Sequence, residues 1–321
     1  MLDILLVTFP FFALVLCGYI AARKRMLPLD AIPGLNTFVL YFALPCMLYR
    51  FGAGTPIRQL LDGVAASVYL LSALLLVAGV AWTSRNERIG WNDASFGALV
   101  AAFPNTGFMG VPLLIALLGA QASGPAILTI LVDLLVTSSL CIALSRMDSA
   151  GVHGAEVAAM KALRGVAVNP MPWAIVLGGI ASALRLEPAK PVAQTIGLLA
   201  DSASPVALFT IGAVLARSQY IAALHEHAPM PARDYVPVVL VKLLVHPLLV
   251  WVLGHAAMLA GVPLRPEALT VMVLVAALPS ASNVALLSER FDADTGRIAR
   301  IILLTTAAAF ITFSAAVALL K

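Results

Sequence analysis

Two short proline-centred stretches hold the residues whose types are most suited to chemistry. The first is FPNTG at residues 103–107 and the second is LPSASN at residues 278–283, and each interrupts a long apolar segment. A proline inside a helix removes one backbone hydrogen bond and clashes with the preceding turn. Each break therefore begins a new half-helix, whose first N–H groups lack a partner within the helix and carry partial positive charge. Such an end binds anions, so the pair of breaks predicts a site for a carboxylate.

The small and polar residues of both breaks complete this predicted site. We expect the chain to cross itself at Pro104 and Pro279 and to contact substrate through Asn105, Thr106, Gly107, Ser280, Ser282 and Asn283. The half-helices should begin near Thr106 and near Ser280. The opposing carbonyl ends, near Ala102 and Ala277, suit a cation or a protonated group. Taken alone, either break is also explained by the ordinary proline kink of a membrane helix.

Two charged residues lie within apolar segments, where an unpaired charge is unfavourable. Asp133 falls in ILTILVDLLVTSS, and an ionised Asp at a bilayer centre costs about 2.5–3.5 kcal/mol on insertion scales. We predict a coupling role for Asp133, as a carboxylate that is protonated during part of a cycle. The alternative is a residue that is kept neutral or paired with a polar neighbour. Lys242 is predicted to attract the anion or to pair with Asp133 or the carbonyl ends, whereas the alternative is snorkelling to the cytoplasmic interface.

Other polar residues in apolar segments give weaker indications. Asp201 and Asn36 are candidate substrate contacts, although helix capping or packing explains them equally well. His246 is better explained as a hydrogen-bonded packing residue than as a titrating group. The sequence shows no metal-ligand spacing, phosphate-binding loop or nucleophile–base pair. We therefore predict no enzyme, no metal site and no cofactor, with a proton or a sodium ion as the candidate coupling ion.

The composition determines which elements can position these residues. The chain is 61% hydrophobic and 11% charged, whereas soluble domains carry roughly 25% charged residues. We therefore expect an all-α polytopic membrane protein, embedded in the lipid bilayer and without a nucleic-acid partner. A span needs about 20 mostly apolar residues. Ten segments qualify: 4–22, 33–51, 64–83, 95–119, 122–145, 166–184, 191–216, 236–260, 267–289 and 298–320.

The basic residues predict the orientation of these spans. Ten spans place both termini on one side of the membrane. The loops on that side hold six Lys and Arg residues, and the loops on the other side hold thirteen. Because positive charge is retained in the cytoplasm, both termini should lie outside it, with the loop 146–165 inside. The expected location is the inner, or cell, membrane.

Proline spacing indicates that the chain contains an internal repeat. The 35 residues between Pro10 and Pro45 recur between Pro170 and Pro205. This spacing predicts two five-helix repeats, at residues 1–145 and 166–321, joined by the loop 146–165. Because five spans is an odd number, the second repeat must be inverted in the membrane. Spans 4 and 9 are then broken helices at matching positions, which is typical of a transporter's midplane site.

The sequence resembles the auxin efflux carrier family of secondary transporters along essentially its whole length. The similar segments are NTFVLYFALP in the second span, AAFPNTGFMGVPLL in the fourth, LADSASPVALFTIGAVLA in the seventh, KLLVHPLLVWVL in the eighth and AALPSASNVALLSERF in the ninth. The opening FFALVLCGYIAARK and the short central loop are most similar to the bacterial branch associated with malonate and related dicarboxylates. Plant members carry Asn on both sides of the crossover proline. This chain has Phe103 and Leu278 before its prolines, so specificity for indole acids is not carried over.

The resemblance implies both an architecture and a function. It implies a scaffold of spans 1, 2, 6 and 7 and a transport domain of spans 3–5 and 8–10, with the broken helices crossing at their prolines. It implies transport of organic anions, typically carboxylates, and leaves open a homodimer through the scaffold helices. We therefore predict a secondary transporter that moves small organic anions, with malonate-like dicarboxylates as candidates, by alternating access. The alternative is a sodium-coupled symporter of the bile-acid type with the same fold; rivals of other classes are an intramembrane lipid enzyme and a receptor.

Overall fold

The computed structural model describes residues 2–56, 61–147, 170–224 and 230–320. Within these residues the secondary structure is helical, apart from one isolated bridge. Seven described helices are long and apolar enough to cross a membrane, and three further apolar helices are shorter. The prediction of an all-α polytopic membrane protein is therefore confirmed. The predicted loop 146–165 lies, from residue 148 onward, outside the described residues.

The chain forms two compact units, and each unit is assembled from separate stretches of sequence. The first unit comprises residues 1–62, 106–128 and 169–226, and the second comprises residues 63–105, 129–168 and 227–321. The chain therefore passes from the second unit to the first within the first proline break, between Asn105 and Thr106.

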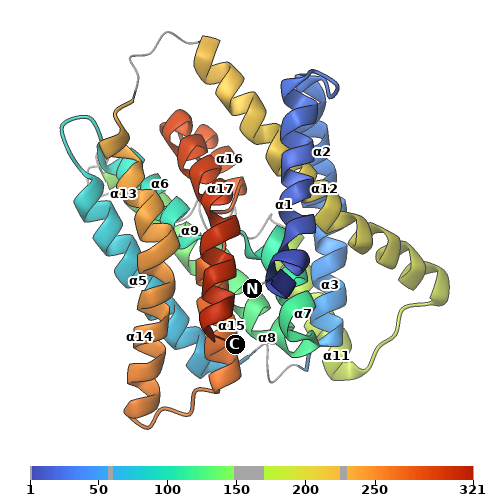
Figure 1. Ribbon diagram of the computed structural model, residues 1–321. Helices are drawn as coiled ribbons and strands as arrows, with labels where there is room; N and C mark the ends of the chain where they lie inside the picture. The colour runs from blue at the N-terminus through green and yellow to red at the C-terminus, as the bar shows by residue number, and fades with distance from the viewer. Residues whose placement is uncertain (1, 57–60, 148–169, 225–229, 321) are drawn as a thin grey trace. The chain divides into compact units, whose positions relative to one another are not determined.

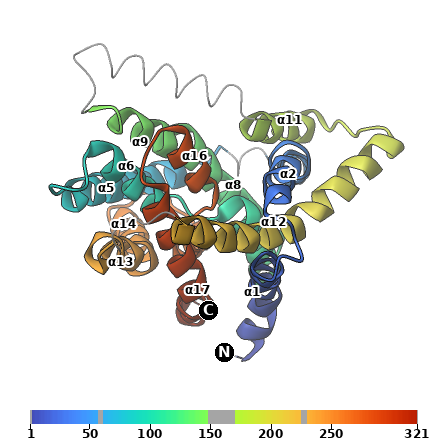
Figure 2. The same ribbon diagram turned by 90° about the horizontal axis from the view of Figure 1, so that it is seen from above.

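The first unit is built around a long helix, α12 (Lys190–Leu224), which packs along α1 (Leu2–Arg23) in Figures 1 and 2. The second predicted span is one continuous helical stretch that includes a π-helical turn. Its parts are η1 (Leu29–Ala31), α2 (Ile32–Phe38), η2 (Val39–Ala43) and α3 (Leu44–Gly54). α3 packs against α11 (Pro170–Leu184) and against α12. The remaining elements of this unit are η3 (Thr106–Gly110), α7 (Val111–Leu118), η4 (Ala120–Ala122) and the start of α8 (Ser123–Val132).

Two glycines bring α1 and α12 into backbone contact. A Cβ added at Gly18 would lie 1.8 Å from the carbonyl oxygen of Phe209, and one added at Gly212 would lie 1.8 Å from that of Val15. In a membrane, packing between small residues holds helices together, because lipid tails leave no hydrophobic drive for association. Only residues without side chains therefore permit this contact between the two helices.

The second unit packs its outer helices around α6 (Trp91–Ala102) and α15 (Pro266–Ala277), both of which bury nearly all of their residues. Their buried residues are mostly apolar, as is typical of a helix surrounded by others. Around them lie α5 (Gly63–Ser84), η5 (Asp133–Thr137), α9 (Ser138–Leu144), η7 (Ala232–Asp234), α13 (Val236–Leu240), η8 (Val241–Val245), α14 (His246–Leu259), α16 (Asn283–Arg290) and α17 (Thr295–Leu320). In Figure 1, α5 and α14 run side by side, in agreement with their contacts.

A buried arginine joins three elements of the second unit. The Arg297 side chain is 1% exposed, and it donates from Nε to the Asp234 carbonyl at 2.7 Å and from Nη1 to the Asp93 carbonyl at 2.8 Å. The carboxylate of Asp93 accepts a hydrogen bond from the backbone N–H of Asp294 at 2.7 Å. These bonds fix the start of α6 against the start of α17, and thereby position the helix that leads into the first proline break.

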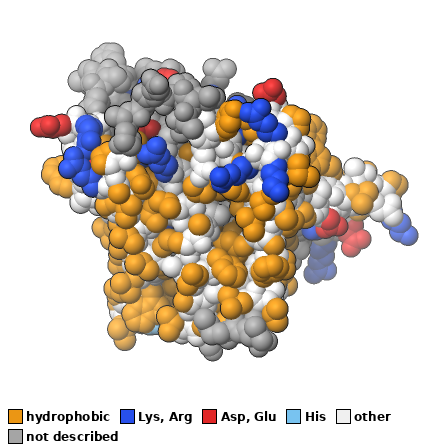
Figure 3. Space-filling model, turned by 45° about the horizontal axis from the view of Figure 1, so that its top comes forward, with side chains coloured by type: hydrophobic (Ala, Val, Ile, Leu, Met, Phe, Trp, Pro, Cys, Tyr) orange, Lys and Arg blue, Asp and Glu red, His pale blue; other side chains and the backbone are white. Residues whose placement is uncertain are grey.

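Helices occupy the described part of all ten stretches that the sequence predicts as spans, and the fourth and the ninth are divided. α6 and the η3–α7 helix fill the fourth stretch, and α15 and α16 fill the ninth. Large hydrophobic side chains remain exposed on several helices, including Trp82 at 74% and Trp173 at 54%. Figure 3 shows hydrophobic side chains over most of the face in view, with Lys and Arg gathered toward one end. A surface of this kind suits contact with lipid.

We predict that Gly18→Ala destabilises the first unit. The new methyl group would overlap the Phe209 carbonyl, so α1 and α12 would have to separate. Overpacking of this kind costs typically about 1–3 kcal/mol. The purified variant should therefore unfold at a lower temperature in detergent than the wild type. Gly197→Ala on α12 is the matched control, because its added Cβ has no neighbour within 4 Å; equal unfolding temperatures for both variants would contradict the prediction.

Candidate functional site

The two proline breaks meet in the second unit as a pair of antiparallel extended segments. Their central residues, Pro104 and Ser280, form the isolated antiparallel bridge. Two backbone hydrogen bonds flank it, from Asn105 N–H to the Pro279 carbonyl at 2.8 Å and from Ala281 N–H to the Phe103 carbonyl at 2.9 Å. The bridge thus pairs backbone groups that the breaks release, as burial in a membrane requires.

Ser280 ties this bridge to two neighbouring helices. Its hydroxyl donates to the Val100 carbonyl near the end of α6 at 2.7 Å, and its backbone N–H donates to Thr305 Oγ1 of α17 at 3.3 Å. The residue is 1% exposed. The hydroxyl proton of this predicted substrate contact is therefore already engaged within the protein.

Helical structure resumes after each break, and each restart bears on the predicted site. In the first unit, η3 begins at Thr106, where the sequence predicts it, and the helix continues to Leu118. In the second unit, α16 begins at Asn283 rather than near Ser280. This start lies three residues later than the predicted position near Ser280, because Ser280 is held in the bridge; helical backbone geometry is regained at Ser282.

Two polar atoms at these restarts are buried without a hydrogen-bond partner among the described residues. They are Thr106 Oγ1 and Asn283 Oδ1. An unsatisfied buried polar group costs about 1–3 kcal/mol. Because such groups are uncommon in native proteins, each one requires an explanation, and a ligand that is bound during function is one. Where a Cβ would lie on the neighbouring Gly107, only the Leu44 side chain approaches, at 3.9 Å, so protein packing does not demand the glycine.

Asp133 is completely buried in the second unit and accepts two side-chain hydrogen bonds. Tyr69 of α5 donates to Oδ2 at 3.0 Å, and Thr137 donates to Oδ1 at 3.1 Å. Asp133 also begins the π-helical turn η5, where its carbonyl accepts a hydrogen bond from the Ser138 hydroxyl at 2.8 Å. The carboxylate therefore has polar neighbours on both oxygens, from its own turn and from α5.

Lys242 is completely buried in η8, which excludes snorkelling of its side chain to an interface. Its Nζ donates to the Ala276 carbonyl in the last turn of α15 at 2.9 Å, and lies 3.1 Å from His246 Nδ1. Asp133 is near enough to interact with it electrostatically. The ammonium thus lies at one of the carbonyl ends where the sequence predicts a cation or a protonated group.

The other two predicted substrate contacts lie in the first unit. Asp201 on α12 forms an ion pair with Arg50 of α3, with 2.6 Å between Oδ1 and Nη1, and its side chain is 69% exposed. Asn36 on α2 is partly buried. One turn after Asp201, the Ser204 hydroxyl donates to the Phe108 carbonyl of η3 at 3.2 Å. Asp201 therefore has a basic partner that sequence reasoning did not consider.

The sequence matches a known family over residues 4–317, and the description of that family is "Membrane transport protein". The chain belongs to this family. The resemblance to the auxin efflux carriers is thereby confirmed, and so is the prediction that the chain is a transporter and not an enzyme.

Three similar proteins illustrate the range of this membrane transport protein family. A "Putative malonate transporter" of Rhizobium meliloti (strain 1021) is 30% identical over 302 residues, which cover 92% of this chain and 89% of that protein. The uncharacterized transporter YfdV of Escherichia coli (strain K12) is 26% identical over 293 residues, 89% of this chain and 88% of that protein. Auxin efflux carrier component 3a of Oryza sativa subsp. japonica is 30% identical over 128 residues, 38% of this chain and 20% of that protein.

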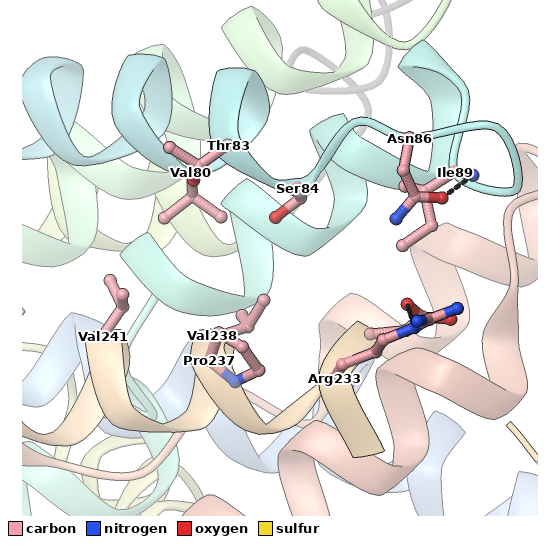
Figure 4. A pocket seen from close by; sticks show the side chains of 10 residues that line it. Val80, Thr83, Ser84, Asn86, Ile89, Arg233, Pro237, Val238 and Val241 are labelled. Atoms are coloured by element: carbon pink, nitrogen blue, oxygen red, sulfur yellow. Dashed lines mark hydrogen bonds and ion pairs between the residues drawn. The ribbon is translucent and has the colours of Figure 1, made fainter. Parts of the chain in front are cut away.

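The second unit of this chain also has a cleft of about 140 Å³, which is distinct from the proline breaks (Figure 4). Ser84 and Asn86, at and after the end of α5, line one side of this cleft, and Arg233 of η7 and Pro237 of α13 line the other. None of its lining residues belongs to the predicted site. The cleft is therefore not the candidate substrate site of this transporter.

Asp133, Lys242, Tyr69 and His246 form a buried cluster in the second unit. His246 is buried and hydrogen-bonded, as the sequence predicts, whereas nothing in the sequence singles out Tyr69. The spacing of Lys242 and His246, four residues apart on one helical stretch, was a signal that could have paired them. Asp133, Lys242 and Thr106 each lie in a π-helical turn, an element that occurs frequently at functional sites but has no pattern in this sequence.

We predict that Thr106→Val does not destabilise the protein, because the replaced hydroxyl has no hydrogen-bond partner among the described residues. Its unfolding temperature in detergent should equal or exceed that of the wild type. Ser280→Ala removes the bond to the Val100 carbonyl and should lower the free energy of unfolding by about 0.5–1.5 kcal/mol. If Thr106→Val were the less stable of the two variants, the Thr106 hydroxyl would have a structural role.

Proposed function

We propose that this protein is a secondary transporter that moves small organic anions, malonate-like dicarboxylates in particular, across the inner membrane by alternating access. The observation that carries the proposal is the antiparallel bridge between two proline breaks, each of which interrupts an otherwise apolar helix. Paired helix breaks of this kind present backbone dipoles at membrane depth, where an anion can be bound without a buried salt bridge. The similarity to a protein named as a putative malonate transporter supports the substrate class.

The proposed architecture has ten spans in two inverted repeats, at residues 1–145 and 166–321. Spans 1, 2, 6 and 7 form a scaffold, and spans 3–5 and 8–10 form a transport domain that moves against it. Both termini lie outside the cytoplasm, as the loop charges favour. A homodimer through the scaffold helices is compatible with this arrangement.

The proposed substrate site surrounds Pro104 and Pro279. Asn105, Thr106, Gly107, Ser280, Ser282 and Asn283 are its binding residues, with Asn36 and Asp201 as candidates from the scaffold. A carboxylate would accept hydrogen bonds from the N–H groups at the restart of a half-helix. The unpartnered atoms of Thr106 and Asn283 support this role, since the Thr106 hydroxyl can donate, and the Asn283 amide can donate after its oxygen and nitrogen exchange places.

Asp133 and Lys242 are the proposed coupling residues. Both are completely buried in the second unit, and each is hydrogen-bonded to another part of it. The alternative function is a sodium-coupled symporter of the bile-acid type, for which uptake would require a sodium gradient. A proton-coupled carrier requires instead a buried group that binds and releases a proton, and Asp133 supplies one.

The proposed site is tested by Asn105→Ala and Asn283→Ala in proteoliposomes that take up radiolabelled malonate. Each variant should reduce uptake at low substrate concentration by about tenfold or more, because a hydrogen bond to a charged group is worth about 1.5–3 kcal/mol. Gln194→Ala, which removes an exposed amide from α12, is the matched control and should transport like the wild type. If uptake by both asparagine variants equals that of the control, the site is assigned wrongly.

A further inference from the structure

We propose that the Lys242 ammonium is a tethered cation that takes the place of an exchangeable coupling ion, and that Asp133 carries a coupling proton. This inference rests on the transport function proposed above and deepens it. It assigns the coupling ion, which the sequence leaves open between a proton and sodium, and it adds Tyr69 and His246 as positioning residues.

The carbonyl end of α15 lacks its usual helical partner at Ala276. In a continued helix the Ala276 carbonyl would accept from the N–H of Ser280, but that N–H donates to Thr305 instead. The carbonyl end of a helix carries partial negative charge, so a cation is favoured there. The Lys242 ammonium fills this position at 2.9 Å. The protein's own side chain thus satisfies a carbonyl that an alkali cation would otherwise coordinate.

His246 contacts the same ammonium from one helical turn further along the chain. Its Nδ1 lies 3.1 Å from the Lys242 ammonium, whereas its Nε2 is buried without a hydrogen-bond partner among the described residues. The side chain is completely buried. The contact through His246 Nδ1 therefore helps to hold the ammonium on the Ala276 carbonyl.

Asp133 carries the charge opposite Lys242. Among the described residues, the ionisable groups that face Asp133 are Tyr69 of α5, Cys141 of α9 and Lys242 of η8. α6 also packs against η5, but its single acidic residue, Asp93, lies in its first turn and accepts from a backbone N–H there. Lys242 is thus the basic partner of Asp133 in this cluster, and the charges of the two side chains cancel when both are ionised.

Protonation of Asp133 would leave the charge of Lys242 uncompensated. The ammonium lies on Ala276, about one helical turn before Pro279 in the second break. A positive charge at this position favours an anion at the break, and by thermodynamic linkage a bound anion favours the proton on Asp133 to the same extent. In one cycle, a proton from water on one side forms an O–H bond with the Asp133 carboxylate. It returns to water on the other side when the anion leaves.

The ion dependence of wild-type uptake tests the proposal directly. Proteoliposomes are held at zero membrane potential with valinomycin and equal potassium, and their interior is made one pH unit more alkaline than the medium. One proton per anion should then accumulate radiolabelled malonate up to about tenfold. Replacing sodium by choline should leave this malonate accumulation unchanged. A need for a sodium gradient, or no response to the pH gradient, would overturn the proposal; absence of carboxylate uptake and exchange under every gradient would instead overturn the transport function itself.

Two variants separate coupling from substrate binding. Asp133→Asn keeps the shape of the side chain and should still exchange internal for external malonate, but it should lose the response to the pH gradient. Asp133→Asn/Lys242→Met removes both charges, so it leaves no unpaired buried charge if the single variant fails to fold. The double variant should also lose the response to the pH gradient, and it should bind malonate more weakly. Glu187→Gln, an exposed carboxylate outside the cluster, is the control and should respond like the wild type. A full pH response in either Asp133 variant would overturn the proposal.

Discussion

Backbone groups released by two prolines must find partners inside the second unit, because the hydrocarbon of a bilayer offers none. The bridge between Pro104 and Ser280 satisfies part of this demand with backbone alone. Side chains satisfy more of it: the Ser280 hydroxyl bonds to the carbonyl of Val100, Thr305 accepts from the Ser280 N–H, and Lys242 donates to the carbonyl of Ala276. These bonds come from four different helical elements. The proline breaks, which form the candidate substrate site, are thus also the places where hydrogen bonds join the helices of the second unit.

The local signals in the sequence located the breaks but not all of their geometry. Proline and the length of the apolar segments act over a few residues, so the helix restart at Thr106 followed from the sequence. The second restart did not, because Ser280 is held by partners far away in the chain, Val100 and Thr305. For the same reason the sequence indicates Asp133 as a functional candidate but does not indicate Tyr69, whose contact with Asp133 joins distant parts of the chain. A carboxylate in an apolar segment stands out in the sequence because burying its charge in a membrane costs free energy. A tyrosine in such a segment is common, and only the fold shows that it contacts the carboxylate.

The basic residues of the predicted loops are unevenly distributed between the two sides of the membrane. The arginines counted in those loops are nevertheless not equivalent in the structure. Arg297 is buried and donates to two carbonyls of the second unit, whereas Arg50 is exposed and pairs with Asp201, which is 151 positions away in the sequence. Exposed ion pairs contribute little to stability, in general about 0–1 kcal/mol. A buried guanidinium is different, since removal of its partners would leave a charge without compensation. Arg297 is therefore part of the framework that positions α6, and Arg50 remains free to change partner at small cost.

Some polar groups of the second unit form hydrogen bonds that join helices, whereas others have a buried atom without a hydrogen-bond partner among the described residues. Ser280 and Thr305 belong to the first kind, because their hydrogen bonds join separate helices. Asn283 belongs to the second, since its amide oxygen is buried without a partner among the described residues. A carrier must bind its anion and also release it, so a permanent salt bridge at the site would hinder the second step. Dipoles at a helix restart, with a lysine already bonded to a backbone carbonyl nearby, attract an anion more weakly than a free ammonium would. The placement of Lys242 on Ala276, rather than directly in the break, suits the release of substrate as well as its capture.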